Sequence, residues 1–174
     1  MSDPLITSPP PQSPVWALYD LSLPERAERL AKDEGELRAQ SGVIMVAGRH
    51  AAQADAFLDG AEMEQLWLKH DRWRASLEAL RTELASSVDG EVFLRAARRA
   101  VWLAARAQEG AAPRLIFGAG MAESLAAWLA GKLIGVPCAV SLQDDTRWTS
   151  KLVSQLRAEA RAVRESSLTQ CLNA

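Results

Sequence analysis

Eight residues with ligand-binding potential follow the apolar runs of this 174-residue chain. They are polar or charged side chains and turn glycines, placed just after segments typical of β-strands: Asp20, Arg49, His50, Gly118, Gly120, Gln143, Asp144 and Asp145. In sheets of parallel strands, ligands bind beyond the carboxyl ends of the strands. We therefore expect these residues to lie along one edge of a sheet and to form a candidate ligand site.

The glycines in Gly118-Ala119-Gly120 permit two interpretations. They could let the backbone approach an anion at the start of a helix, as in nucleotide-binding proteins. However, the run is only part of a dinucleotide-binding fingerprint, because the third glycine is missing from its expected place. We favour a tight structural turn, which glycine permits because it lacks a Cβ.

The other candidates also have alternative roles. Asp144 and Asp145 could give oxygen ligands to a divalent ion, but a helix cap explains adjacent carboxylates more simply. We therefore expect neither a metal nor another cofactor. His50 follows a strand, where a general base could act, yet no pattern in the sequence supplies a nucleophile or an orienting partner for it. No catalytic residue is assigned.

The elements that would position these residues alternate between strand and helix. Short apolar runs predict strands at residues 15–19, 43–47, 114–117 and 138–142. Apolar residues at helical spacing predict helices at residues 22–41, 73–84, 92–108, 122–133 and from about residue 146 onward. Gly135 and Pro137 predict the stop between the fourth helix and the strand after it.

Several local features are less direct. Ser22-Leu23-Pro24-Glu25 predicts a capping box at the start of the first helix, and Asp145 or Thr146 is expected to cap the last long one. Residues 54–67 could form one helix, or they could include a strand at residues 64–68. We favour the strand, because an alternating fold requires one there. Residues 167–172 are interpreted as a final short strand.

Together these elements predict an α/β fold: a doubly wound, mostly parallel sheet with helices on both faces, in a single Rossmann-like domain over residues 15–174. Residues 1–14 hold five of the eight prolines and are expected to be a disordered leader. The proline run could dock onto an aromatic groove, but a solvated tail is the favoured interpretation.

Composition narrows the class of protein. Hydrophobic residues make up 48% of the chain and the net charge is -2, which is typical of a globular domain and not of a dedicated nucleic-acid binder. Cys138 and Cys171 lie in apolar segments without metal-ligand spacing, so we expect reduced structural thiols and a cytoplasmic location. Residues 115–142 carry only Glu123 and Lys132 as formal charges, but glycine and proline divide them into shorter pieces, so no membrane span is expected.

One helix carries a set of basic residues. Arg95, Arg98, Arg99 and Arg106 occupy much of the predicted helix at residues 92–108. Such a set could attract phosphate or an acidic partner. A solvated helix face is the commoner arrangement and the one we favour.

The order of elements over residues 15–174 resembles a known family, and the segment 132–145 carries the specific part of the resemblance. An apolar strand, a small-residue turn, a helix that ends in Lys132-Leu133-Ile134-Gly135-Val136-Pro137, and a second strand followed by Gln143-Asp144 are similar to the amino-terminal domain of GT-B glycosyltransferases of the family 4 type. In that family this domain binds the acceptor and a second domain binds the nucleotide sugar. The family's histidine falls on Gln143 and its aspartate on Asp144. Its glycine-rich loop after the first strand is replaced by residues 20–24.

The resemblance implies an acceptor-side domain that is incomplete or inactive alone, with a donor-binding protein subunit and a saccharide acceptor as partners. The alternative is a non-catalytic α/β interaction or scaffold module that uses its leader or its arginine-bearing helix as the contact. A weaker third possibility is a small nucleotide-binding regulator built on the Gly118–Gly120 turn.

Overall fold

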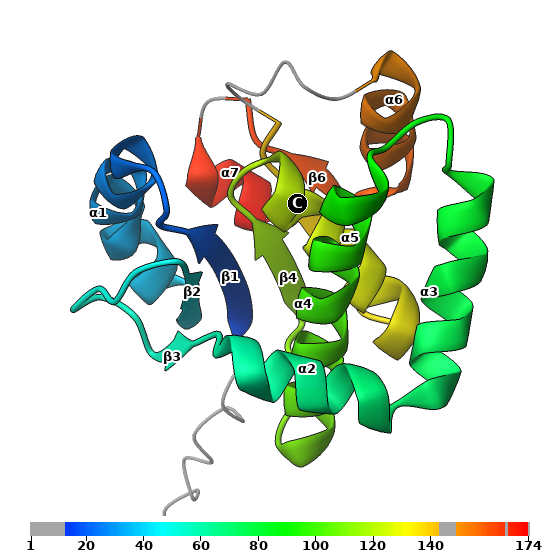
Figure 1. Ribbon diagram of the computed structural model, residues 1–174. Coiled ribbons are helices and arrows are strands. Elements are labelled where there is room, and N and C mark those ends of the chain that lie inside the picture. Colours follow the sequence, from blue (N-terminus) through cyan, green and yellow to red (C-terminus); the bar gives the residue numbers. More distant parts are fainter. Residues whose placement is uncertain (1–12, 143–148, 166, 174) are drawn as a thin grey trace, which may run out of the picture.

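The structure is a computed structural model that describes residues 13–142, 149–165 and 167–173. Its centre is a sheet of six strands in the order β3-β2-β1-β4-β5-β6 (Figure 1). Every pair of neighbouring strands is parallel. The strands are β1 Val15–Asp20, β2 Gly42–Ala47, β3 Ala56–Phe57, β4 Leu115–Gly118, β5 Cys138–Val140 and β6 Ala162–Val163. The predicted α/β fold with a parallel sheet is confirmed, and its strand order is that of Rossmann domains.

Helices cover both faces of the sheet, as predicted (Figure 1). The helices on one face are α1 Pro24–Ala39 and α7 Leu168–Asn173. The helices on the opposite side are α2 Gly60–Lys69, α3 Asp71–Glu83, α4 Gly90–Glu109, α5 Met121–Ile134 and α6 Ser150–Glu159. There α4 and α5 pack side by side, and α2 and α3 pack against α4.

Strand β1 divides the apolar interior into two cores. Val15, Ala17 and Tyr19 enter the core beneath α1 and α7, whereas Trp16 and Leu18 enter the core beneath α4 and α5. This alternation follows from strand geometry, since successive side chains point to opposite faces. A strand buried on both sides must therefore be apolar along its whole length, as this one is until Asp20.

Glycines set the close packing of α5. A Cβ on Gly118 would overlap the backbone of Glu123 and Ser124, so this glycine lets the first turn of α5 lie directly against β4. At the other end, Gly135 ends the helix in the left-handed conformation, with φ 73°. The predicted stop before Pro137 is confirmed.

Two predicted strands are wrong. Residues 64–68 belong to α2, whose N-cap Asp59 accepts a hydrogen bond from the amide of Glu62. Ala56–Phe57 forms the strand that the alternating fold requires. Residues 167–172 are largely helix α7, because Leu168, Cys171 and Leu172 have the three- and four-residue spacing of a buried helix face. The last strand lies earlier, at Ala162–Val163.

Two predicted caps are also wrong. Ser22 does not cap α1: its hydroxyl and amide both donate to Asp20, and the N-cap position is Leu23 with no side-chain hydrogen bond. Helix α6 is capped by Thr149, which accepts from the amide of Leu152. A serine hydroxyl bonds whichever partner the tertiary structure brings close, and for Ser22 that partner is Asp20.

Candidate functional site

A polar cavity opens at the carboxyl edge of the sheet, where β1 and β4 lie side by side. From β1 the chain leaves towards α1 on one face, and from β4 it leaves towards α5 on the other (Figure 1). Such a reversal of direction creates a crevice between the two loops, which is where α/β proteins bind their ligands. The cavity holds about 240 Å³. We call it the switch-point cavity, and its polar lining residues are Asp20, Ser22, Arg26, Arg95, Arg99 and Glu123.

A buried ion pair forms the floor of the cavity. Nη2 of Arg99, on α4, donates to Oδ2 of Asp20 at 2.7 Å. The Arg99 side chain is only 8% exposed. Burial acts to raise the pKa of Asp20, but the hydrogen bonds from Ser22 and the charge of Arg99 outweigh it and lower this pKa below its usual range. Asp20 is therefore a fully engaged carboxylate and not a free general base.

Glu123 has the opposite environment. It lies in the first turn of α5 and is 4% exposed. Burial raises the pKa of Glu123, although its own backbone amide, Arg26 and Arg99 partly oppose this shift. A carboxyl group with a raised pKa is a candidate for exchanging or donating a proton closer to neutral pH. The pKa values of the two carboxyl groups in this cavity are therefore shifted in opposite directions.

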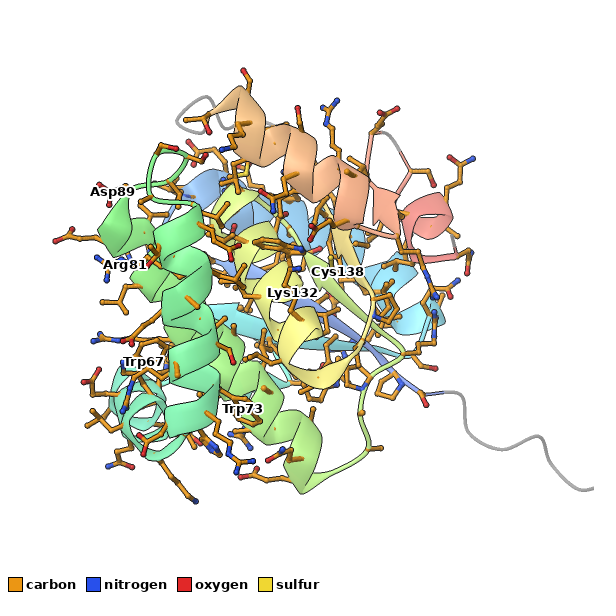
Figure 2. The ribbon with its side chains drawn as sticks, turned by 90° about the vertical axis from the view of Figure 1, so that its right-hand side faces the viewer. Trp67, Trp73, Arg81, Asp89, Lys132 and Cys138 are labelled. Atoms are coloured by element: carbon orange, nitrogen blue, oxygen red, sulfur yellow. The ribbon has the colours of Figure 1, made fainter. Side chains whose placement is uncertain are left out.

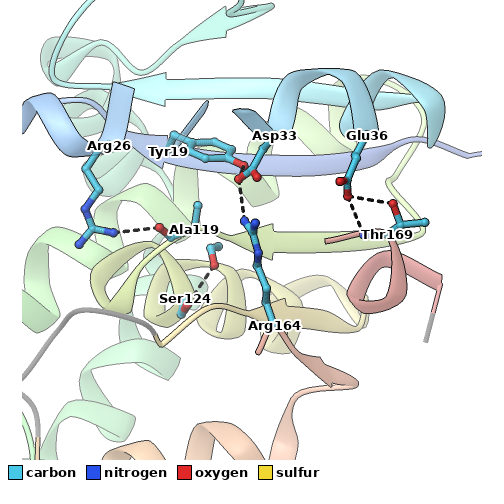
Figure 3. A network of polar contacts seen from close by, with 9 residues as sticks. Tyr19, Arg26, Asp33, Glu36, Ala119, Ser124, Arg164 and Thr169 are labelled. Carbon is cyan, nitrogen blue, oxygen red and sulfur yellow. Dashed lines mark hydrogen bonds and ion pairs between the residues drawn. The ribbon is translucent and has the colours of Figure 1, made fainter. Parts of the chain in front are cut away.

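Two further arginines line the cavity. Nη1 of Arg26, on α1, donates to the carbonyl of Ala119 at 2.9 Å (Figure 3). Arg95 lies one helical turn before Arg99 on α4 and is exposed. Within the described ranges Arg95 has no hydrogen bond or ion pair, and Arg26 pairs with no carboxylate. Both guanidinium groups can therefore bind a ligand without breaking an ion pair of the protein.

A second hollow of about 400 Å³ continues from Arg95. We call it the α3–α4 groove: it lies between the α3–α4 connection and the start of α5, and it shares Arg95 and Ala122 with the switch-point cavity. Its less polar wall includes Ala85, Val88 and Val92. Figure 2 shows Asp89 and Arg81 near this connection, towards the end of α3 that lies away from Trp73.

The structure brings together only some of the predicted site residues. Asp20 lines the switch-point cavity. Gly120 borders it, because a Cβ there would overlap Arg26 and Glu123. Gly118 is instead a packing residue beneath α5, which agrees with the structural interpretation of this turn.

The remaining predicted residues lie apart from the cavity or outside the description. Arg49 and His50 follow β2 on an exposed loop, and neither lines the cavity. The His50 ring stacks on Phe57 with 4.0 Å between ring centroids. These two residues are therefore not part of the site. Gln143, Asp144 and Asp145 lie outside the described residues, so their predicted role stays a prediction.

Four charged site residues were not selected from the sequence: Arg26, Arg95, Arg99 and Glu123. The expectation of a solvated arginine face is wrong for Arg99, which is buried. One available signal was Glu123, an acid inside an apolar helix, since such a residue requires polar neighbours. A second was the four-residue spacing of Arg95 and Arg99, which places both on one side of α4.

Other candidate chemistry is limited. In the part of the chain that the structure describes, no three His, Cys, Asp or Glu side chains lie together as metal ligands. Burial raises the pKa of Cys138 and of Cys171 to about 11, so both thiols stay protonated, as expected of structural cysteines. Among the described helices, none has the length and apolar character needed to cross a bilayer.

Comparisons with protein-family models, with curated proteins and with solved structures give no match for this chain. The fold and the geometry of the switch-point cavity are therefore the basis for a functional proposal. A Rossmann-like fold serves many unrelated activities, so the side chains of the cavity carry more weight than the topology.

Proposed function

We propose that this chain is the acceptor-side domain of a GT-B-type, glycosyltransferase-like enzyme and that it binds a saccharide in the switch-point cavity. A separate donor-binding protein would complete the active site. The sequence supports this through the segment 132–145, which resembles the family. The single observation that carries the proposal is the polar cavity at the junction of β1 and β4.

The lining of the cavity suits a ligand rich in hydroxyl groups. Carboxylates accept hydrogen bonds and guanidinium groups donate them. Together they can therefore bind a sugar hydroxyl both as a donor and as an acceptor. Asp20 and Glu123 supply the acceptors, and Arg26, Arg95 and Arg99 supply the donors. Because the donors and acceptors come from β1, α1, α4 and α5, the fold holds them in a fixed arrangement.

The same lining supports the need for a partner. Asp20 is engaged by Arg99 and Ser22, and no described residue in the cavity is a free nucleophile with an adjacent base. Transfer of a sugar requires an activated donor next to the acceptor. In this proposal the chain positions the acceptor, and the donor-binding protein closes over the carboxyl edge.

Titration of the isotope-labelled full chain with neutral mono- and disaccharides, followed by NMR, tests the proposal. We expect amide shifts at Asp20, Gly120 and Glu123, with unchanged signals at Arg49 and His50, which lie on an exposed loop away from the cavity. A purified candidate donor-binding protein should then bind the chain more tightly in the presence of saccharide. Shifts confined to other surfaces, or no shifts with any saccharide, would contradict the proposal.

A non-catalytic interaction module is the second proposal, and one observation favours it. Leu68, near the end of α2, has 62% of its surface exposed, the larger value of the two exposed leucines in the described residues. An exposed leucine beside the α2–α3 corner could contact another protein. Leu68→Glu should then abolish binding of a partner already identified for this chain, whereas Arg95→Gln should leave that binding unchanged.

A further inference from the structure

We propose that the ligand of the switch-point cavity is anionic: a sugar, or a similar small polyol, that carries a phosphate or a carboxylate group held by Arg95 and Arg26. The inference rests on the proposed function, because it takes the same cavity as the acceptor site. It goes further by naming the chemical class of the acceptor. Four features of the cavity support it.

The first feature is the balance of charge. Among the described residues, three arginines and two acidic residues line the cavity, so their formal excess is one positive charge even with both acids ionised. The charge of Asp20 is already matched by Arg99, so Glu123 is the remaining acid among the described lining residues of this cavity, beside Arg26 and Arg95. A cavity with surplus guanidinium groups favours an anion over a neutral ligand.

The second feature is the state of Glu123. Burial holds its pKa above the usual range for a glutamate, which shifts this carboxyl group towards its neutral form. A neutral carboxyl group can donate a hydrogen bond to an anionic oxygen, whereas an ionised one would repel it. An anion in the cavity would stabilise the protonated form of Glu123 further. Anion binding and protonation of Glu123 therefore promote each other.

The third feature is the buried arginine of the cavity, Arg99, together with the start of α5. Nε of Arg99 is buried and has no hydrogen-bond partner in the described part of the chain. The first turn of α5 also borders the cavity through Ala122 and Glu123. Helix N-termini carry partial positive charge, and charge-assisted hydrogen bonds strengthen where water is excluded. The buried Arg99 and the N-terminus of α5 therefore both favour an anion in the cavity.

The fourth feature is the continuation of the cavity into the α3–α4 groove. Arg95 and Ala122 line both hollows, so an anionic group at Arg95 would leave room for the rest of the ligand. The groove wall is less polar, with Ala85, Val88 and Val92. A ligand with one anionic group and a larger, weakly polar body fits this pair of hollows better than an isolated ion does.

Isothermal titration calorimetry of the full chain tests the inference with four probes: glucose, glucose 6-phosphate, glucuronate and inorganic phosphate. We expect glucose 6-phosphate or glucuronate to bind at least about tenfold more tightly than glucose, since a charge-assisted contact contributes about that factor. Which of the two binds more tightly distinguishes a phosphate from a carboxylate site. Equal or weaker binding of both anionic sugars relative to glucose would overturn the inference.

Substitutions of single arginines test which side chains hold the anionic group. Arg95→Gln should remove most of the preference for the anionic sugar, and Arg26→Gln should reduce it. Arg98→Gln is the matched control, because Arg98 lies on the same helix but pairs with Glu64 and does not line the cavity. An unchanged preference in both Arg95→Gln and Arg26→Gln, or an equal loss in Arg98→Gln, would assign the effect to general surface charge and overturn the inference.

The same data separate this inference from the proposed function. If glucose binds in the cavity and charge adds nothing, the saccharide site stands and the anionic ligand is wrong. If inorganic phosphate binds as tightly as glucose 6-phosphate and glucose does not bind, the anion site stands and the saccharide function is wrong. If none of the four probes binds at millimolar concentration, both are wrong.

Discussion

Tyr19 and Asp20, adjacent residues at the end of β1, belong to two charged regions that differ in how their charges are paired. Tyr19 points into the core beneath α1 and α7, whereas Asp20 points towards α4 and α5. On the Tyr19 side, Asp33 accepts a hydrogen bond from the Tyr19 hydroxyl at 2.8 Å and another from Nη1 of Arg164 at 2.7 Å (Figure 3). On the Asp20 side, the ion pair with Arg99 borders a cavity.

The Tyr19 region is closed. The Asp33 side chain is 4% exposed, and burial together with Asp33 raises the pKa of Tyr19 well above its usual value. Glu36, one turn along α1, accepts hydrogen bonds from the amide and hydroxyl of Thr169 (Figure 3). These contacts attach the carboxyl-terminal segment to α1. We interpret the region as structural, because its charges are matched within the protein and it lines no part of the switch-point cavity.

The Asp20 region is open and holds more positive groups than its own acids engage. That difference separates a charged cluster that stabilises the fold from one that is available to a ligand. Buried ion pairs alone do not indicate function, since both regions have one. The Asp20 region is distinguished by the cavity beside the ion pair and by Arg95, which has no ion-pair partner among the described residues.

The largest effect is expected for Asp33→Ala. It leaves the half-buried Arg164 without its carboxylate and the buried Tyr19 hydroxyl without its acceptor, so we expect a loss of about 3 kcal/mol in the free energy of unfolding. Urea denaturation measures this loss. Asp71→Ala, which removes an exposed partner of Arg74, should cost less than about 1 kcal/mol and serves as the control. Equal losses in the two variants would show that the Tyr19 region is not a buried network.

A smaller loss, about 1–3 kcal/mol, is expected for Asp20→Ala. The Asp20 side chain is 20% exposed, against 4% for Asp33, so we expect its removal to cost less than in the closed region. Inorganic phosphate at millimolar concentration should restore part of the stability, since a ligand that binds only the folded state stabilises it. Thermal unfolding with and without phosphate measures this, and Asp33→Ala should show no such rescue. Rescue of both variants would remove the distinction between the regions.

Glu123→Gln should change how stability depends on pH. Because the folded-state pKa of Glu123 is raised above its unfolded value, its stabilising contribution is complete below the unfolded pKa and is lost as pH rises through the folded pKa. Replacement by neutral glutamine should therefore raise stability at pH 8 relative to the unmodified chain and have little effect at pH 4. Urea denaturation at both pH values tests this. A loss of stability at pH 8 would mean that Glu123 is needed as an ionised partner of the arginines.

The smallest effect on stability is expected for Arg95→Gln. The side chain is exposed and unpaired within the described residues, so the free energy of unfolding should change by no more than about 0.5 kcal/mol. Urea denaturation beside the calorimetric titrations checks that any loss of binding is not a loss of folding. A destabilisation above about 1 kcal/mol would place Arg95 among the structural residues instead.

The sequence predicted the parts that depend on neighbouring residues. Continuous apolar strands, the α5 stop at Gly135 and buried thiols follow from local pattern and chain stereochemistry. The strands β3 and β6 were missed because each has two residues. A strand that short has no periodicity, and it exists only through its pairing with β2 or β5.

The position of Asp20 and Gly120 at the carboxyl edge could likewise be predicted, because it follows from where β1 and β4 end. Their partners could not. Asp20 and Arg99 are separated by 79 positions along the chain. Asp33 contacts both Tyr19, near the start of the chain, and Arg164, near its end. Only the tertiary structure decides which long polar side chains converge, since a surface arginine and a buried ion-pair arginine have the same local pattern and differ in what packs above them.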